Sequence, residues 1–286
     1  MERYYKFAGI ELSVIAPEEK YYTDEHRLKA FAVDTVMSPH IYNVEMTDVL
    51  PKPIGSCIAA YPNFRVYQEE EKYVRYIGSV AETLEGAYIR VENCGKNHKI
   101  QVLNSAYPER ITTKTILQSI EAEHLLAQNE GFILHCSYVE INGKAMLFTA
   151  PSETGKSTQA ELWRELRGAQ IINGDRAAVR LVDGQIVAEG IPFAGSSSFC
   201  QNRSLPIDAV IYLGQAPQTN IQKIEGSLAF MKLWEGVSVN AWNKSDTEQV
   251  SQVVREVVER VPIFYLACTP DESAVVALEK ALREKR

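Results

Sequence analysis

The sequence predicts an α/β protein in which a mixed β-sheet with flanking helices follows a smaller β-rich N-terminal domain. Three observations predict this fold class. Short β-type runs, separated by Pro, Gly and Asn, fill the first hundred residues without a convincing helix of three turns. Residues 131–168 follow the pattern of strand, tight turn, strand, loop and helix. Strand-like and helix-like patterns then continue to the C-terminus.

Composition narrows the functional classes. The chain has 286 residues and a formal net charge of −7, which argues against broad nucleic-acid binding because that needs a basic face. No apolar run approaches the roughly eighteen residues of a membrane span, and the N-terminus lacks the pattern of a signal peptide. The five cysteines are scattered without a C-x-x-C pair, so neither zinc nor disulfides are expected. We therefore expect a cytoplasmic protein without membrane or nucleic-acid partners; the sequence leaves homo-oligomerisation open.

Residues 1–108 are expected to form the β-rich domain, and residues 109–286 the second domain. The β-type runs of the first part span residues 10–15, 28–33, 65–67, 73–77, 88–91 and 100–103. Tyr107-Pro108 marks the boundary because proline ends the strand pattern. The first domain is a candidate for substrate recognition, although strand propensity is the favoured explanation of its many tyrosines.

A helix over residues 112–128 is expected to lead into a β-hairpin. The hairpin strands are residues 132–141 and 144–149, joined by Asn142-Gly143, the strongest short-range signal for a tight turn. This turn predicts that Ile141 pairs with Lys144 and His135 with Ala150. His135 is thereby placed beside the loop that follows the hairpin, either as a functional residue or as a histidine of the core.

The segment after the hairpin carries the pattern G-x-x-x-x-G-K-[ST] (Walker A), with alanine at the first position. We call residues 150–157 the phosphate loop. A helix N-terminus offers free N–H groups and a positive dipole end to phosphate. Lys156 can reach the outer phosphates and the Ser157 hydroxyl can ligate Mg²⁺. The expected nucleotide-binding residues are Ser152, Glu153, Thr154, Gly155, Lys156, Ser157 and Thr158. The plain alternative is an incidental strand–turn–helix.

A buried strand over residues 169–173 ends in Gly174-Asp175-Arg176. A carboxylate at this place can accept a proton from an attacking hydroxyl or hold Mg²⁺ through water. Asp175 is thus a candidate catalytic and metal-binding residue, unless the segment is a simple turn. A second hairpin with an Asp183-Gly184 turn follows. The serine-rich loop over residues 190–198 either closes over a ligand or merely connects.

The C-terminal third shows clear local signals. Strands are expected at residues 209–213 and 263–268, and a helix at 227–234. Ser245 begins a capping box that predicts the start of the next helix, and Pro262 ends it. Pro270 is expected at the first position of the last helix.

Together these residues resemble the HPr kinase/phosphorylase-like proteins, which share a P-loop nucleotide-binding core with ATP-dependent phosphoenolpyruvate carboxykinase. The resemblance covers about residues 115–286. It rests on "LHCS" around His135, the Asn-Gly hairpin, "APSETGKST" and "IINGDR". The β-rich N-terminal segment differs from that of HPr kinase, so the substrate of that family is not carried over.

The resemblance implies ATP and Mg²⁺ at Ser152 to Thr158, with Ser157 as metal ligand. It also implies that Asp175 activates the acceptor hydroxyl or binds metal, and that His135 lies near the transferred phosphate. Three positions depart from the family pattern: Ala150 and Glu153 replace loop glycines, and Gly174 replaces the first aspartate of a D-D pair.

The sequence therefore predicts an ATP-dependent kinase that phosphorylates a Ser or Thr hydroxyl of a protein or peptide. Its catalytic residues are expected to be Asp175, His135 and Lys156. A nucleotide-binding scaffold with little chemistry is the alternative that Glu153 and Gly174 favour. A small-molecule kinase or carboxykinase-like enzyme is a further alternative, for which no additional basic cluster is evident.

Overall fold

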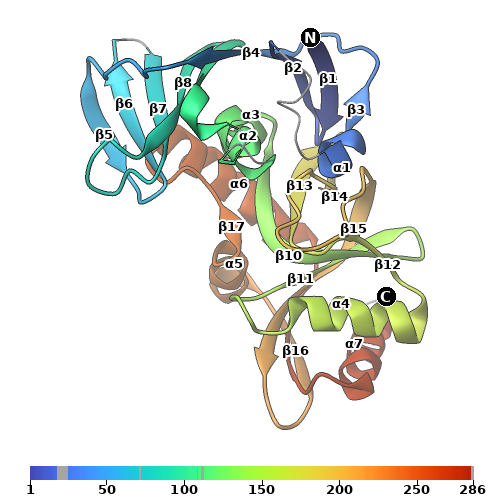
Figure 1. Ribbon diagram of the computed structural model, residues 1–286. Coiled ribbons are helices and arrows are strands. Elements are labelled where there is room, and N and C mark those ends of the chain that lie inside the picture. The colour runs from blue at the N-terminus through green and yellow to red at the C-terminus, as the bar shows by residue number, and fades with distance from the viewer. Residues whose placement is uncertain (18–24, 71, 108, 111–112, 285–286) are drawn as a thin grey trace. The chain divides into compact units, whose positions relative to one another are not determined.

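The computed structural model describes residues 1–17, 25–70, 72–107, 109–110 and 113–284. The chain is mixed α/β, with two large mixed sheets and few helices (Figure 1). It folds into two compact units, Met1–Ala122 and Glu123–Arg286. The division into two domains, residues 1–108 and 109–286, stays a prediction from the sequence. Among the described helices, none is both long and apolar enough to cross a bilayer.

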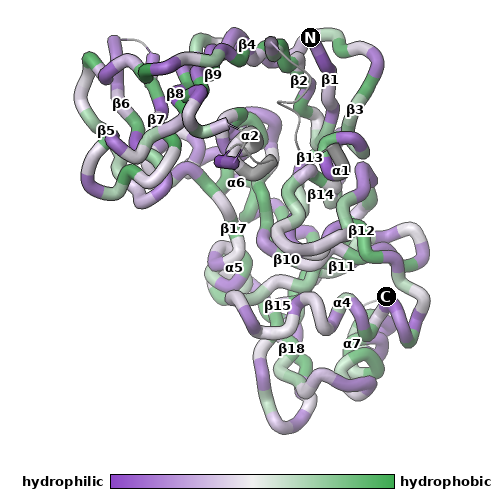
Figure 2. Tube along the Cα trace, viewed as in Figure 1, coloured by the Kyte–Doolittle hydropathy of each residue, from purple (hydrophilic) through white to green (hydrophobic). Residues whose placement is uncertain are grey.

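The N-terminal unit contains a nine-stranded mixed sheet in the order β3-β1-β2-β4-β9-β8-β7-β6-β5. Its strands are β1 (Glu2–Phe7), β2 (Ile10–Ile15), β3 (Ala32–Val33), β4 (His40–Thr47), β5 (Ser56–Ala60), β6 (Phe64–Glu69), β7 (Lys72–Gly78), β8 (Ala87–Cys94) and β9 (Asn97–Leu103). Hydrophilic and hydrophobic residues are interspersed along these strands (Figure 2). Buried and partly exposed residues alternate along most of β9, whereas residues 74–78 of β7 are all buried, so both faces of the sheet are covered there.

Two predictions for residues 1–128 were wrong. Residues 28–33 were expected to form one strand, but α1 (Glu25–Lys29) takes the first part and β3 only the last two residues. The helix expected over residues 112–128 is two helices, α2 (Thr113–Ile120) and α3 (Ala122–Gln128), with the short 3₁₀ helix η2 (Asn104–Ala106) before them. Glu121 separates α2 from α3 because its φ of 57° is left-handed. Thr112 lies outside the described residues.

The C-terminal unit has a second nine-stranded mixed sheet with helices around it. The strands are β10 (Gly131–Ile141), β11 (Lys144–Thr149), β12 (Gln170–Asn173), β13 (Arg176–Val182), β14 (Gln185–Glu189), β15 (Ser204–Gln215), β16 (Asn220–Ile224), β17 (Val237–Ser238) and β18 (Ile263–Cys268). The helices are α4 (Lys156–Arg167), α5 (Gly226–Trp234), α6 (Lys244–Arg260) and α7 (Glu272–Glu284).

The hairpin register is confirmed from Ile141 paired with Lys144 to Cys136 paired with Thr149. The expected pair of His135 with Ala150 was wrong, because the ladder ends one residue earlier and His135 pairs with Arg176 of β13. Pairing continues from β13 through β14 and β15 back to β11, so five strands form a closed circuit. Closure removes free edges from these five strands.

Each face of the second sheet packs against two helices. Leu134 and Tyr138 of β10 join a core that includes residues of α5 and α6. Val139 of β10 joins the opposite core, which contains Trp163 of α4 and Leu278 of α7. Because side chains alternate along a strand, residues 135, 137 and 139 of β10 point to the α4 side.

Helix starts in this unit differ from the predicted ones by a few residues. The cap of α6 is Asn243, whose side chain accepts a hydrogen bond from the Asp246 backbone N–H at 3.3 Å, so the box predicted at Ser245 was wrong. Pro270 precedes α7 by two residues and does not occupy its first position. Strand β16 carried no recognised signal, because it is short and mostly exposed.

Candidate active site

The candidate site is built around the point where β10 changes its neighbours. Residues 131–135 of β10 pair with β13, whereas residues 136–141 pair with β11. The His135 N–H donates to the Gly236 carbonyl at 2.8 Å, and the His135 carbonyl accepts from the Thr149 hydroxyl at 2.9 Å. His135 is therefore held on both backbone groups at the break in the sheet, and its imidazole remains partly exposed.

The phosphate loop directly follows β11, the strand that pairs with β10 beyond the break. Gly155 precedes α4 with φ of 110°, and within the described chain no side chain caps this helix end. The free N–H groups and the dipole of α4 therefore face whatever occupies the loop. At the other end, Gly168 stops α4 in the left-handed conformation, as its sequence signal predicts.

Lys156 is buried and bends back over its own loop. Its ammonium donates to the carbonyls of Ala150 at 3.0 Å and Pro151 at 3.1 Å. Burial lowers the pKa of Lys156, while the negative charge of Asp175 acts in the opposite direction. Asp175 is thus close enough to Lys156 to be felt electrostatically.

Asp175 lies in the turn between β12 and β13, opposite the break in β10. Its Oδ1 lies 3.4 Å from His135 Nε2, and its Oδ2 accepts from Arg176 Nε at 3.0 Å. The contact with His135 and the charge of Arg176 lower the pKa of Asp175, and burial opposes them. Asp175 is therefore a carboxylate at neutral pH.

The turn itself is shaped by Asn173. Its side-chain oxygen accepts from the backbone N–H groups of Asp175 and Arg176, each at 3.0 Å. The Cys136 N–H donates to the Asp175 carbonyl at 3.0 Å, which ties the turn to β10. Fixed in this way, the carboxylate projects toward His135 without depending on a flexible loop.

The remaining predicted residues surround the entrance of α4. Ser152, Glu153, Ser157 and Thr158 are exposed, and Thr154 is half-buried. Glu153 has φ of 64°, a left-handed conformation that glycine adopts more readily. Ala150 has a negative φ, so a glycine is not required there.

The donor set suits a hard cation that keeps other ligands. No cluster of three or more potential metal-binding side chains occurs among the described residues. Asp175 carries a carboxylate and Ser157 a hydroxyl, and Mg²⁺ is commonly held by one or two such protein oxygens together with phosphates and water. An exposed Ser157 at the first turn of α4 is free to supply such an oxygen.

Sequence reasoning gave no position for the loop after Gly190. Gly195 lies against Asp175, since a Cβ on Gly195 would come within 2.7 Å of the Asp175 carboxylate carbon. A Cβ on Gly174 would come within 2.2 Å of the Ser197 hydroxyl oxygen. In the sequence, only the run of small residues from Gly195 to Ser198 indicated close packing, and it did not show which segment packs there.

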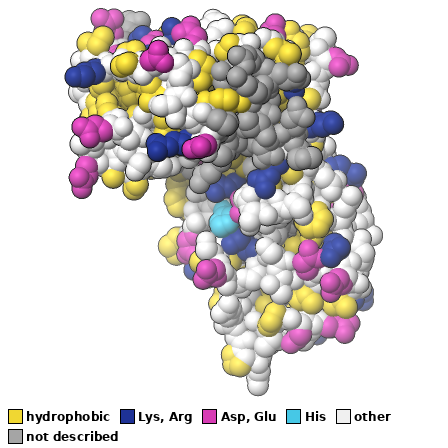
Figure 3. All heavy atoms as spheres, in the orientation of Figure 1, with side chains coloured by type: hydrophobic (Ala, Val, Ile, Leu, Met, Phe, Trp, Pro, Cys, Tyr) yellow, Lys and Arg dark blue, Asp and Glu magenta, His cyan; other side chains and the backbone are white. Residues whose placement is uncertain are grey.

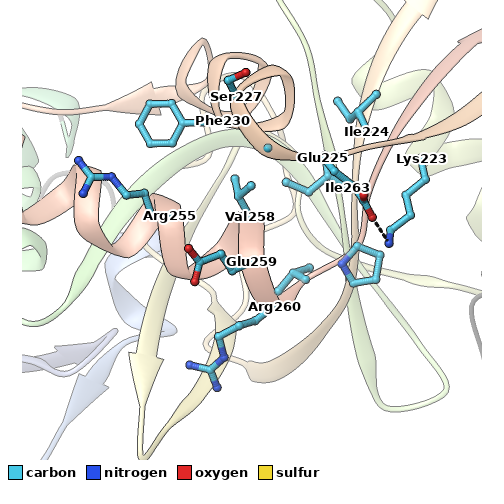
Figure 4. A pocket seen from close by; sticks show the side chains of 13 residues that line it. Lys223, Ile224, Glu225, Ser227, Phe230, Arg255, Val258, Glu259, Arg260 and Ile263 are labelled. Carbon is cyan, nitrogen blue, oxygen red and sulfur yellow. Dashed lines mark ion pairs between the residues drawn. The ribbon is translucent and has the colours of Figure 1, made fainter.

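Two pockets in this unit differ in their relation to the loop. One, of about 510 Å³, is lined by Thr154, Gly155 and Thr158 and by the carboxyl ends of β15 and β18. The other, of about 570 Å³, lies between α5, α6 and β16, away from the phosphate loop (Figure 4). Lys223 and Glu225 form an ion pair in it, and Arg255 lines its other side (Figure 4). The first pocket is the one that adjoins the phosphate loop.

No protein-family model matches the sequence, and no curated protein matches it. Among solved structures, the chain is similar to the Hpr(Ser) kinase/phosphatase from Coxiella burnetii, with a TM-score of 0.32 and 13% sequence identity. The match covers 54% of this chain and 90% of the other. A similarity of this size does not assign the chain to that family.

Proposed function

We propose that this protein is an ATP-dependent phosphotransferase that acts on a Ser or Thr hydroxyl of a protein or peptide. One observation carries the proposal. A buried lysine at an uncapped helix N-terminus lies within electrostatic reach of a carboxylate that contacts a histidine. Phosphoryl transfer requires mainly positioning and charge stabilisation, and these groups can supply both.

The phosphate-binding part rests on the N–H groups of the loop and on Lys156. Without nucleotide, the Lys156 ammonium donates to two carbonyls of its own loop. A triphosphate in the loop would offer it stronger, charged acceptors. The pocket beside Thr154 and Thr158 has the size of a small-ligand site and suits the nucleoside. Bound Mg²⁺, held by Ser157, would neutralise phosphate charge.

Asp175 is proposed to receive the proton of the acceptor hydroxyl. Its lowered pKa keeps it ionised but makes it a weak base. A weak base suffices where the transition state is loose and the nucleophile has transferred little charge. His135 contacts the carboxylate and fixes its direction, while Arg176 balances its charge.

The N-terminal unit offers a surface for an extended acceptor peptide. Among the described strands, β5 pairs only with β6, so its outer edge is open. Exposed apolar side chains on and beside this edge include Ile54 and Ile58. Figure 3 shows hydrophobic side chains gathered over this end of the sheet. An open edge binds peptides by adding a strand, with side-chain contacts for selection.

A nucleotide-binding scaffold is the second candidate, and Glu153 favours it. The side chain brings a negative charge to the phosphate loop, and its left-handed backbone is strained. Both features would weaken the hold on a triphosphate. Turnover would then be low although the fold of the site is intact.

Thermal unfolding with and without ATP and Mg²⁺ tests the binding step. Wild type is expected to gain about 2.7 kcal/mol when ATP is a hundredfold above its Kd. Lys156→Ala should lose most of that gain, and Lys144→Ala, an exposed lysine of the same unit, should keep it. Equal gains in wild type and Lys156→Ala, or none in wild type, would contradict the proposal.

A further inference from the structure

The loop that packs on the Asp175 turn, residues 194–198, is called the serine loop here. Its two flanks are fastened to β12. The Asn173 side-chain amide donates to the carbonyls of Ile191 at 3.0 Å and Phe193 at 2.9 Å. On the far side, the Gln201 N–H donates to the Ile172 carbonyl at 3.0 Å. Both anchors belong to the strand that ends in the Asp175 turn, so the loop and the turn are held together.

Within the serine loop, two positions touch the turn directly. Gly195 lacks a side chain where one would meet the Asp175 carboxylate at 2.7–2.9 Å. Gly174 lacks a side chain where one would meet the Ser197 hydroxyl at 2.2 Å. The Ser197 hydroxyl therefore fills the space over Gly174, one residue from the proposed base. It also accepts a hydrogen bond from the Phe199 N–H at 3.1 Å.

Two properties of this hydroxyl suit a phosphoryl acceptor. It is half-buried, so it is shielded from bulk water without being sealed off. A serine held beside the base is at a very high effective concentration, because no second molecule has to be brought in. Ser196 and Ser198 are exposed, and the atoms found over Gly174 belong to Ser197.

We propose that Ser197 is a site of autophosphorylation in cis, an inference that rests on the proposed phosphotransferase function. The Ser197 oxygen forms a bond to the γ-phosphorus of ATP, and the bond from that phosphorus to the bridging oxygen of ADP breaks. The hydroxyl proton passes to the Asp175 carboxylate, and ADP leaves with the electron pair of the broken bond. The products are ADP and phosphoserine at residue 197.

The modification would close the site to other acceptors. A phosphoserine carries about two negative charges near pH 7. Beside Asp175 these charges repel the carboxylate, which already accepts a hydrogen bond from the Arg176 guanidinium. The phosphorylated serine loop would then occupy the acceptor position, so phosphorylation of a peptide should slow as Ser197 is modified.

The test incubates the full chain with ATP and Mg²⁺ and follows two independent readouts. Intact mass and peptide sequencing locate added phosphate, and ADP formation with ATP-induced thermal stabilisation reports the proposed function itself. Wild type should gain one HPO₃ group per chain at Ser197. Ser196→Ala should gain it equally, Ser197→Ala should lose it, and Ser197→Thr should carry it on residue 197. Lys156→Ala should gain none.

The rate of phosphorylation and the identity of the modified residue decide whether the inference holds. A first-order rate that does not change on tenfold dilution of the protein supports transfer in cis. ADP formation without phosphate at residue 197, or phosphate on another residue, would overturn the inference while the proposed function stands. No stabilisation by ATP and no ADP would overturn both.

Discussion

Two ionic clusters, one in each unit, are made of similar groups but differ in burial. In the N-terminal unit, Glu121 lies 3.5 Å from Arg75 and accepts from the Tyr73 hydroxyl at 2.9 Å. The side chains of Arg75 and Glu121 are 7% and 4% exposed. In the C-terminal unit, the corresponding values for His135 and Asp175 are 30% and 24%.

The difference separates a structural cluster from a candidate reactive one. Arg75 also donates to the carbonyls of Gln118 at 2.9 Å and Ser119 at 2.8 Å, so its charge fastens the end of α2 to the sheet. Asp175 instead faces a partly open site with a lysine in electrostatic reach. Buried charges held by several partners hold a fold, whereas half-exposed charges at a break in a sheet remain available to a ligand.

The largest expected effect is on turnover. Asp175→Asn should reduce ATP-dependent phosphorylation by about 10²–10⁴-fold, the usual contribution of a general base. The free energy of unfolding of the Asp175→Asn variant should differ from that of wild type by less than about 1 kcal/mol, because the carboxylate is partly solvated and the amide has the same shape. Kinetic assays and urea unfolding of the same sample measure the two. An unchanged rate would remove Asp175 from its role.

The opposite pattern is expected at the buried cluster. Glu121→Ala leaves Arg75 as an uncompensated buried charge and should lower the free energy of unfolding by about 3–5 kcal/mol. Lys223→Ala breaks an exposed ion pair and should cost about 0–1 kcal/mol. Urea unfolding followed by fluorescence compares them. Similar losses in both variants would mean that burial does not distinguish the two pairs.

Close packing at the Asp175 turn predicts a medium effect. Gly195→Ala combines a φ of 51° with a Cβ against the Asp175 carboxylate, so it should cost about 1–3 kcal/mol and displace the carboxylate. Gly184→Ala has a φ of 75° but open space, and should cost only about 1 kcal/mol. Turnover should fall in the first variant only. Equal effects on both stability and turnover would show that the contact is unimportant.

A pH dependence follows from the lowered pKa of Asp175. A carboxylate whose pKa is lower in the folded than in the unfolded state stabilises the protein at pH values above its unfolded-state pKa of 3.8. This stabilisation is lost as the pH falls through the folded-state pKa. The stability difference between wild type and Asp175→Asn should therefore shrink on acidification below pH 3.8. Urea unfolding from neutral to acidic pH measures it, and a constant difference would contradict the stated shift.

The smallest effect concerns strained backbone at matched sites in the two units. Glu153→Gly and Glu70→Gly both relieve a left-handed φ, of 64° and 53°, and each should stabilise its unit by about 0.5–1 kcal/mol. Only Glu153→Gly also removes a negative charge from the phosphate loop, so only it should tighten ATP binding. Calorimetric titration with ATP distinguishes them. Tighter binding in Glu70→Gly would indicate a general stability effect.

Local signals predicted the parts of the fold that local physics decides. Asn142-Gly143 fixed the hairpin register because few turns fit two residues with positive φ, and Gly168 ended α4 for a similar reason. The break at Glu121 was missed because a non-glycine left-handed residue is held there by distant partners. Asn243 was missed as a cap because a nearer serine matched the capping pattern.

The sequence named candidate residues, which stay predictions, but it did not show how the strands bring them together. The hairpin register predicted that His135 pairs with Ala150, yet His135 pairs with Arg176 of β13, a strand of the second predicted hairpin. The packing of Gly195 on Asp175 is likewise a contact between distant segments. Spacing along the chain names candidate residues, whereas their neighbours follow from the topology of the whole sheet.

At the point where β10 changes its pairing partners, one residue connects two separate parts of the C-terminal unit. The strand continues through the break, but at His135 both backbone hydrogen bonds go outside the regular ladders, to Gly236 and Thr149. Gly236 directly precedes β17, and Thr149 directly precedes the phosphate loop. The backbone of His135 thus joins the end of β11, where the phosphate loop begins, to the segment between α5 and β17, so these two parts of the unit share one anchoring residue.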